Sequence, residues 1–279
     1  MPGRLILCAT PIGNLDDASP RLEATLQAAD TVYAEDTRRS QTLLRHLGID
    51  RSLRSYFAGN EAERSREMAA ALTQGATIAL VTDAGMPAIA DPGHSAVRAA
   101  LEVDAEVTVI PGPSAVTAAL AVSGLPSERF VFEGFLPRKA GARAERFAMI
   151  AEEQRTIVLF SAPSRLVRDL EDCRSVLGSE RPLAVVRELT KLHEEIWRGS
   201  LGAAAERWGE FVRPRGEFTL VLGGASRPNP PPLAELVGAV GARISAGAST
   251  SDAVRDVAAE NGVSRRELYE LVVRDPGGA

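Results

Sequence analysis

The chain has 279 residues, of which 45% are apolar and 25% charged, and its net charge is −5. These fractions are those of a globular protein and exclude a disordered or fibrous chain, while the length favours two compact domains over one. The negative total charge argues against overall electrostatic attraction to nucleic acid, but it leaves room for a local basic patch.

Several classes of protein are excluded by signals that the sequence lacks. The first apolar run is too short for a signal peptide and no stretch is long enough to span a bilayer, so we expect a cytoplasmic protein with no membrane partner. No G-x-G-x-x-G follows the first expected strand and no P-loop occurs, which disfavours a dehydrogenase or an ATPase. Cys8 and Cys173 lie far apart and the three histidines are scattered, so no metal is expected.

Short β-rich runs alternate with helix-like segments over residues 1–111, which predicts a doubly wound α/β domain with a parallel sheet. Strands are expected at Arg4–Thr10, Thr31–Asp36, Leu53–Phe57, Thr77–Thr82 and Glu106–Ile110. Helices are expected at Ser19–Ala29, Thr37–Leu47, Glu61–Gln74 and Ser95–Val103.

A second α/β domain is expected over residues 112–227, after a hinge at Pro111-Gly112-Pro113 and an alanine-rich helix from Ser114 to Gly124. Its strands are predicted at Phe130–Phe135, Thr156–Phe160, Leu183–Glu188 and Phe218–Leu222. Its helices are predicted at Ala142–Glu153, Arg165–Leu177 and Gly202–Phe211, and the globular body should end near Arg227.

A small helical extension is expected over residues 228–279. Consecutive prolines make Asn229–Pro232 a stiff linker. Helices are predicted at Leu233–Ala246 and Ser251–Glu260, and Ser264 caps a third helix that runs through Val273. The spacing resembles a helix-turn-helix, a pattern that other three-helix units share.

Four loops follow expected strands, at the sheet edge where open α/β folds place their ligands. They are Ala9–Leu15, Ala34–Arg39, Thr82–Gly93 and Ile110–Ala115. The third loop combines a carboxylate with glycines and prolines, a composition that suits an adenosine-type cofactor and equally a rigid turn. Carboxylates at strand ends, namely Glu35, Asp36, Asp83 and Glu188, are the candidates for acid–base chemistry.

Seven motifs, taken in order, resemble one family. They are Ala9–Leu15, Ala34–Arg38, Asp83–Gly85, Asp91–Gly93, Pro111–Ala115, Phe132–Lys139 and Arg187–Glu195. This set resembles the ribosomal RNA small-subunit methyltransferase I family, a branch of the tetrapyrrole-methylase superfamily. The resemblance covers about residues 4 to 224 and continues more loosely into the tail.

The resemblance implies two α/β domains with S-adenosylmethionine in the cleft between them. It implies methyl transfer to the 2′-oxygen of a cytidine in small-subunit ribosomal RNA near the decoding centre, on naked RNA or on the assembled subunit, by a homodimer. The implied cofactor contacts are Pro11, Asp83, Gly85, Met86, Ser114, Ala115, Phe160, Ser161, Ala162 and Leu189.

Two segments depart from the family pattern. Where the family commonly shows Tyr-His-Glu-His-Asn-Glu, this chain has Tyr56–Glu61 without histidine. Where the family has Tyr-Glu-Ser-Pro-His-Arg, this chain has Phe160–Arg165, which contains neither the glutamate nor the histidine of that pattern. A general base must then come from Glu35, Asp36, Glu61 or Glu188.

For the chemistry, we predict the pair Glu35 and Asp36 as catalytic, with Glu188 and Lys191 opposite. Arg38 or Lys191 could hold the neighbouring phosphate and favour the developing oxyanion. Basic clusters could form the RNA surface. The predicted RNA contacts are Arg39, Arg138, Lys139, Arg265 and Arg266, and Arg143 with Arg146 is a further cluster of the same kind.

Two other functions stay open at this point. A methyltransferase of the same fold could act on a small tetrapyrrole-type molecule, because fold alone does not set the substrate. A ribosome-binding protein could keep the cofactor pocket without turnover. The basic segment at Pro137–Lys139, the run Arg187–Lys191 and the helical tail favour RNA.

Overall fold

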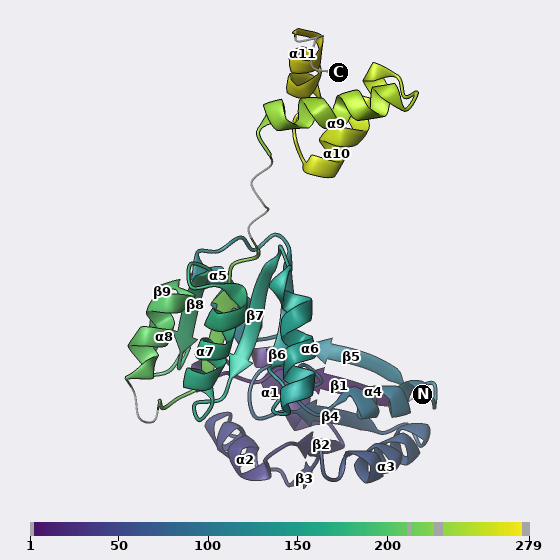
Figure 1. The fold of residues 1–279 in the computed structure, drawn as a ribbon. Helices are drawn as coiled ribbons and strands as arrows, with labels where there is room; N and C mark the ends of the chain where they lie inside the picture. Colours follow the sequence, from purple (N-terminus) through teal and green to yellow (C-terminus); the bar gives the residue numbers. More distant parts are fainter. Residues whose placement is uncertain (1–2, 211–213, 226–230, 275–279) are drawn as a thin grey trace. The chain divides into compact units, whose positions relative to one another are not determined.

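The computed structural model describes residues 3–210, 214–225 and 231–274. These residues form two compact units, one within residues 1–225 and one within 226–279 (Figure 1), and each is described by itself. The α/β class and the C-terminal helical extension predicted from the sequence are confirmed.

The first half of the larger unit is a parallel sheet of five strands. The strands are β1 (Arg4–Cys8), β2 (Thr31–Ala34), β3 (Leu53–Ser55), β4 (Thr77–Val81) and β5 (Glu106–Ile110). Their spatial order is β3-β2-β4-β1-β5, and every neighbouring pair is parallel. Parallel strands end at the same edge, so the loops after β1, β2 and β4 meet there.

Helices cover both faces of this sheet, as the doubly wound pattern predicts. They are α1 (Pro20–Ala28), α2 (Thr37–His46), α3 (Glu61–Thr73) and α4 (His94–Leu101). Leu22 and Leu44 of α1 and α2 pack in one core, while Met68 and Ala96 of α3 and α4 pack in another. Strands buried on both faces therefore read as continuous apolar runs, which is why the sequence indicates them clearly.

The second half of this unit is a mixed sheet. It begins with α5 (Ala115–Ser123) and contains β6 (Phe130–Phe135), α6 (Ala140–Ala151), β7 (Thr156–Ser161), α7 (Leu166–Leu177), β8 (Pro182–Arg187), β9 (Glu195–Ser200), α8 (Leu201–Gly209) and β10 (Phe218–Leu222). The strand order is β6-β7-β10-β8-β9, with β6 and β7 parallel and the other pairs antiparallel. Helix α5 packs on one face through Val116 and Leu120, and α6, α7 and α8 cover the other.

Strand β9 is the main element that the sequence did not predict. It lies at the sheet edge, where Ile196 and Trp197 face opposite cores and the other residues are partly exposed. A short 3-10 helix, η1 (Leu15–Asp17), was also missed. The predicted end of α8 at Phe211 and the predicted end of the body near Arg227 lie outside the described residues.

The smaller unit is a bundle of α9 (Leu233–Ser245), α10 (Thr250–Asn261) and α11 (Arg265–Arg274). Leu236, Val254 and Leu268 belong to a core of its own. Gly262 ends α10 with a positive φ of 65°, the left-handed conformation in which glycine costs least. The predicted linker at Asn229–Pro232 lies partly outside the described residues. No helix in the described ranges is long and apolar enough to cross a membrane.

Candidate functional site

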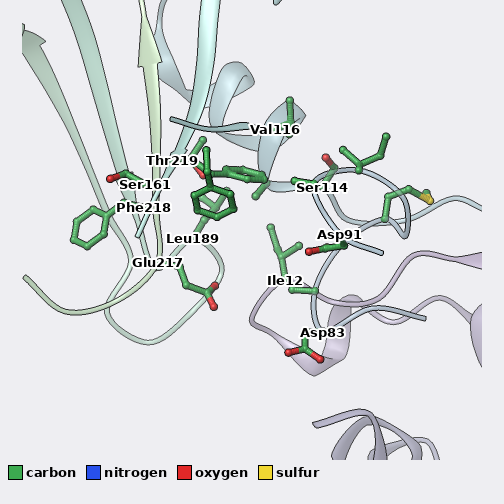
Figure 2. A pocket seen from close by; sticks show the side chains of 18 of the residues that line it. Ile12, Asp83, Asp91, Ser114, Val116, Ser161, Leu189, Glu217, Phe218 and Thr219 are labelled. Atoms are coloured by element: carbon green, nitrogen blue, oxygen red, sulfur yellow. The ribbon is translucent and has the colours of Figure 1, made fainter. Parts of the chain in front are cut away.

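A cavity of about 360 Å³ lies where the carboxyl edge of the first sheet meets the second half of the larger unit. This volume is within the range of small-molecule sites. Figure 2 shows Ile12, Asp83, Asp91 and Ser114 on one side, and Ser161, Leu189, Glu217 and Thr219 on the other. Two separate sheets thus build one binding space.

The loops after β1 and β4 are joined by backbone hydrogen bonds. The amide of Thr10 donates to the carbonyl of Gly85 (2.9 Å), and the amide of Gly85 donates back to Thr10 (3.1 Å). Gly85 has a φ of +80°, which a residue with a side chain adopts only with strain. A glycine at this position therefore lets the two loops meet at the cavity floor.

Carboxylates connect the ends of β2 and β4. Asp83 Oδ1 accepts from the amide of Asp36 (3.0 Å), and its other oxygen lies 3.2 Å from Arg39 Nη1. Glu35 Oε2 in turn accepts from the amide of Asp83 (3.4 Å). The pKa of Glu35 is raised above its ordinary value, mainly by burial and also by repulsion from the carboxylate of Asp83. The Asp83 amide and Arg39 lower this pKa but do not cancel the increase.

Asp91 also lines the cavity, although it is not among the site residues predicted from the sequence. Burial raises the pKa of Asp91 to about 7, with smaller contributions from the negative charges of Glu35 and Asp83. The available signal was its position directly before Pro92-Gly93, in the loop already expected to approach a ligand. The proximity of the other two carboxylates is visible only in the folded chain.

The second sheet contributes an aromatic wall and a hydroxyl group. The ring of Phe160 meets those of Phe132 and Phe135, with centroids 4.9 and 5.5 Å away. Next to it, Ser161 Oγ donates to Asp169 Oδ2 (2.7 Å), and Asp169 Oδ1 accepts from the buried Arg143 (2.8 Å). Asp169, which is 1% exposed, therefore orients Ser161 at the cavity.

Most of the residues predicted to contact a cofactor lie together. Those lining the cavity are Asp83, Gly85, Met86, Ser114, Ala115, Phe160, Ser161, Ala162 and Leu189. Pro11 does not line it, although its neighbour Ile12 does.

The residues predicted as catalytic are more scattered. Glu35 lines the cavity, but Asp36 and Arg38 do not. Asp36 caps α2 by accepting from the amide of Arg38 (2.9 Å), and its carboxylate also pairs with the Arg38 side chain (3.1 Å). The side-chain hydrogen bond from Arg38 keeps the pKa of Asp36 below its usual value.

Glu188 and Lys191 also lie outside the cavity lining and pair with each other. Lys191 Nζ lies 2.9 Å from Glu188 Oε1 and 2.9 Å from Glu217 Oε2. Although burial acts to raise it, the pKa of Glu188 is lowered by hydrogen bonds from Lys191 and from the Glu217 amide. In the same loop, Thr190 Oγ1 accepts from the amide of Asn14 (3.1 Å), so this segment holds the two halves together.

The residues predicted to contact RNA fall in three places. Arg39 lines the cavity, and Arg138 and Lys139 are exposed after β6. In the three-helix unit, Arg265 donates to Ser251 and Arg266 pairs with Glu270.

Arg143 corrects the sequence-based expectation of a basic surface. It is 4% exposed and pairs with Asp169 and Asp172. Arg146, from the same cluster, pairs with Glu133. Neither charge is an unpaired surface cation.

Within the described part of the chain, no cluster of histidine, cysteine, aspartate or glutamate residues has the arrangement of a metal site. His46 instead lies 3.4 Å from Asp16 on the surface. The chemistry that the cavity offers is therefore that of carboxylates, one guanidinium and an aromatic wall.

Residues 4–205 match the Tetrapyrrole (Corrin/Porphyrin) Methylases. Two proteins named Ribosomal RNA small subunit methyltransferase I, from Synechocystis and Mycobacterium tuberculosis H37Rv, are 46% and 47% identical to this chain. The matches cover 96% and 99% of this chain and 97% and 98% of those proteins.

The chain belongs to the ribosomal RNA small subunit methyltransferase I family. The resemblance inferred from its motifs is thereby confirmed. Solved structures with the same fold are more distant. A conserved hypothetical protein from Aeropyrum pernix has a TM-score of 0.62 at 19% identity, covering 99% of this chain and 96% of its own. Uroporphyrin-III C-methyl transferase from Thermus thermophilus, complexed with S-adenosylhomocysteine, has a TM-score of 0.55 at 19% identity, covering 79% and 97%.

For this member of the methyltransferase I family, we predict that Asp169→Ala lowers the free energy of unfolding by roughly 3 kcal/mol, because it leaves the buried Arg143 with one carboxylate partner fewer. Glu106→Gln is the control, since it breaks a half-exposed pair with Arg4 and should cost about 0–1 kcal/mol. Urea denaturation of both variants measures the difference. Equal losses would show that the buried network does not have this structural role.

Proposed function

We propose that this protein transfers a methyl group from S-adenosylmethionine to the 2′-oxygen of a cytidine in small-subunit ribosomal RNA, near the decoding centre. The observation that carries the proposal is the shared cavity of the two sheets, in a chain that matches proteins named for this RNA over nearly its whole length. Such a substrate implies a cytoplasmic setting.

The lining of the cavity fits the cofactor. The aromatic wall at Phe160 and the apolar side chains of Ile12 and Leu189 suit an adenine ring, while Asp83 and Glu35 suit hydroxyl groups and positive charge. When bound, S-adenosylmethionine supplies an electrophilic methyl group on a sulfonium. The protein's own task is then to align the acceptor oxygen and exclude water.

The choice of RNA as substrate rests on the sequence relatives. The fold does not decide it, because solved proteins with this fold include one named for uroporphyrin III and one named diphthine synthase. Arg39 supports an anionic substrate, since its half-exposed guanidinium lies at the cavity and can meet a phosphate.

Methyl transfer from labelled cofactor to small subunits that lack the modification tests the proposed function. We expect label on the 2′-oxygen of one cytidine after nuclease digestion, and naked RNA assayed in parallel shows whether the assembled subunit is required. Label on a tetrapyrrole precursor instead of RNA would favour a small-molecule enzyme. Binding of the subunit without transfer would favour a non-catalytic ribosome-binding protein.

For the cofactor site, we predict that Ala115→Leu weakens S-adenosylmethionine binding by about tenfold or more, because Ala115 lines the cavity and a larger side chain fills space that the ligand needs. Asp83→Ala should weaken it as well. Calorimetry in the presence of a chelator measures both. Ala121→Leu, on the exposed side of the same helix, is the matched control. Unchanged affinity in both cavity variants would refute the assignment.

For the tail, we predict that removing residues 229–279 weakens capture of the small subunit and leaves cofactor affinity unchanged. The described lining of the cavity comes from residues 12–219, and the three-helix unit has its own core. Methylation by full-length and truncated protein across a salt series measures the effect, because phosphate contacts make affinity fall with salt.

Charge-reversal variants of the full chain distinguish an electrostatic role of the tail in RNA binding from a structural one. The full chain with Arg265→Glu and Arg266→Glu should lose subunit affinity, whereas Arg255→Glu, a charge reversal in the same unit, should retain it. Equal activity of truncated and full-length protein on the subunit at every salt concentration would exclude the tail as an RNA-capturing element.

The family resemblance also supports a homodimer, for which light scattering should give twice the mass of one chain.

A further inference from the structure

Methylation of a ribose hydroxyl requires a proton acceptor. The oxygen–carbon bond forms as the carbon–sulfur bond breaks, the sulfur keeps the bonding electron pair and becomes neutral, and the hydroxyl proton must leave. A ribose hydroxyl is a weak acid, so a carboxylate at the cavity assists this transfer. The identity of that carboxylate matters only if the methyl transfer proposed above takes place, so its assignment rests on the proposed function.

Three of the carboxylates considered from the sequence have other partners. Asp36 caps α2 and pairs with Arg38, and Glu188 pairs with Lys191. Glu61 Oε1 accepts from Tyr56 Oη (3.1 Å) and from the amides of Gly93 (3.2 Å) and Ser95 (3.4 Å). None of the three lines the cavity.

The three other carboxylates that line the cavity also have partners. Glu217 Oε2 lies 2.9 Å from Lys191 Nζ. Asp83 accepts from the amide of Asp36 and pairs with Arg39, so both of its oxygens have partners. Glu35 accepts from the amide of Asp83. The bonds of Asp83 and Glu35 connect the loops that form the site, and protonating either group would weaken them.

We propose that the carboxylate of Asp91 accepts the proton of the ribose 2′-hydroxyl. Asp91 lines the cavity, and its carboxylate points into it in Figure 2. Among the residues that the structure describes, no side chain or amide forms a hydrogen bond or ion pair with this carboxylate. Both of its oxygens are therefore available to a ligand.

The backbone around Asp91 is held in an unusual conformation. Ala88 and Ala90 have φ values of 68° and 64°, which non-glycine residues adopt at a cost of about 1–3 kcal/mol each. The turn is closed by the Ala88 amide, which donates to the carbonyl of Pro92 (3.3 Å), and by Glu61, which holds the amide of Gly93. Such strain persists only where the surrounding structure imposes it, and here its result is to present Asp91 to the cavity.

The electrostatic surroundings suit a base that works near neutral pH. The ionisable groups lining the same cavity are Glu35 and Asp83 after β2 and β4, Arg39 on α2, and Glu217 before β10. Burial, followed by Glu35 and Asp83, raises the pKa of Asp91 to about 7. A base is most effective when its pKa lies near the working pH. Because only the deprotonated form accepts a proton, turnover should rise as pH increases through this value.

The test compares Asp91→Asn with wild type at saturating cofactor and small subunits, from about pH 5 to about pH 9. The amide keeps the shape of the side chain but cannot accept the proton, so we expect turnover to fall by about 10²–10⁴-fold and the rise near neutral pH to disappear. The affinity for S-adenosylhomocysteine should stay within about threefold of wild type. Asp91→Glu, which keeps a carboxylate, should recover part of the turnover, and Asp50→Asn on the surface is the matched control.

Each alternative has a different outcome. An Asp91→Asn variant that turns over like wild type, with the same pH profile, overturns the assignment, and Glu35→Gln then tests the remaining candidate. A large loss of S-adenosylhomocysteine affinity also overturns it, because Asp91 would then hold the cofactor. Failure of wild type to methylate the subunit overturns the proposed function and this inference together, a result distinct from loss in the variant alone.

Discussion

The site depends on the reciprocal hydrogen bonds between Thr10 and Gly85, which join the ends of β1 and β4. These strands are neighbours in the sheet although their paired residues, from Arg4 and Thr77 to Leu7 and Leu80, are 73 positions apart in the sequence. Because β4 also pairs with β2 on its other side, Asp83 lies close enough to the end of β2 to accept from Asp36 and pair with Arg39. The bridge to the β1 loop and the pairing of β4 with β2 together set the positions of the charged groups along this edge of the cavity.

The cavity is acidic although its proposed substrate is an anion. Glu35, Asp83, Asp91 and Glu217 line it, against Arg39 as the single cation in the described lining. This balance suits a cationic methyl donor, whose positive charge is lost on transfer, and the lost attraction favours release of the neutral product. RNA must then be held mainly by basic groups away from the cavity, and the exposed Arg138 and Lys139 have that character.

Sequence alone predicted the parts of the fold that have a strong local pattern. The buried parallel strands β1, β2 and β4 are mainly apolar runs bounded by turn residues, and they were placed within a few residues of their observed bounds. The partly exposed edge strand β5 was also found at its observed bounds. Strand β9 was missed because an edge strand whose two large apolar residues face opposite cores shows no alternation.

Long-range pairing explains the differences at the site. Arg143 has the sequence signature of a basic surface, but partners 26 and 29 residues away bury its charge. Asp91 gave no local signal of acid–base chemistry, because its pKa is raised first by burial and then by carboxylates from the loops after β2 and β4, and both arise only in the folded chain. The cofactor loops were easier to find, since glycine and proline at strand ends are local features.

The fold shows what the two segments that depart from the expected family pattern do in this chain. The segment Tyr56–Glu61, where the resemblance led us to expect histidines, does not line the cavity. Tyr56 and Glu61 instead hold the start of α4 and the Asp91 loop. At position 161, where the resemblance led us to expect a carboxylate, the serine donates to Asp169, whose charge is balanced by Arg143 and Arg165. The negative charge of Asp169 is therefore neutralised behind the cavity wall. The loops of the first sheet, with Glu35, Asp83 and Asp91, are left to supply most of the acidity that acts within it.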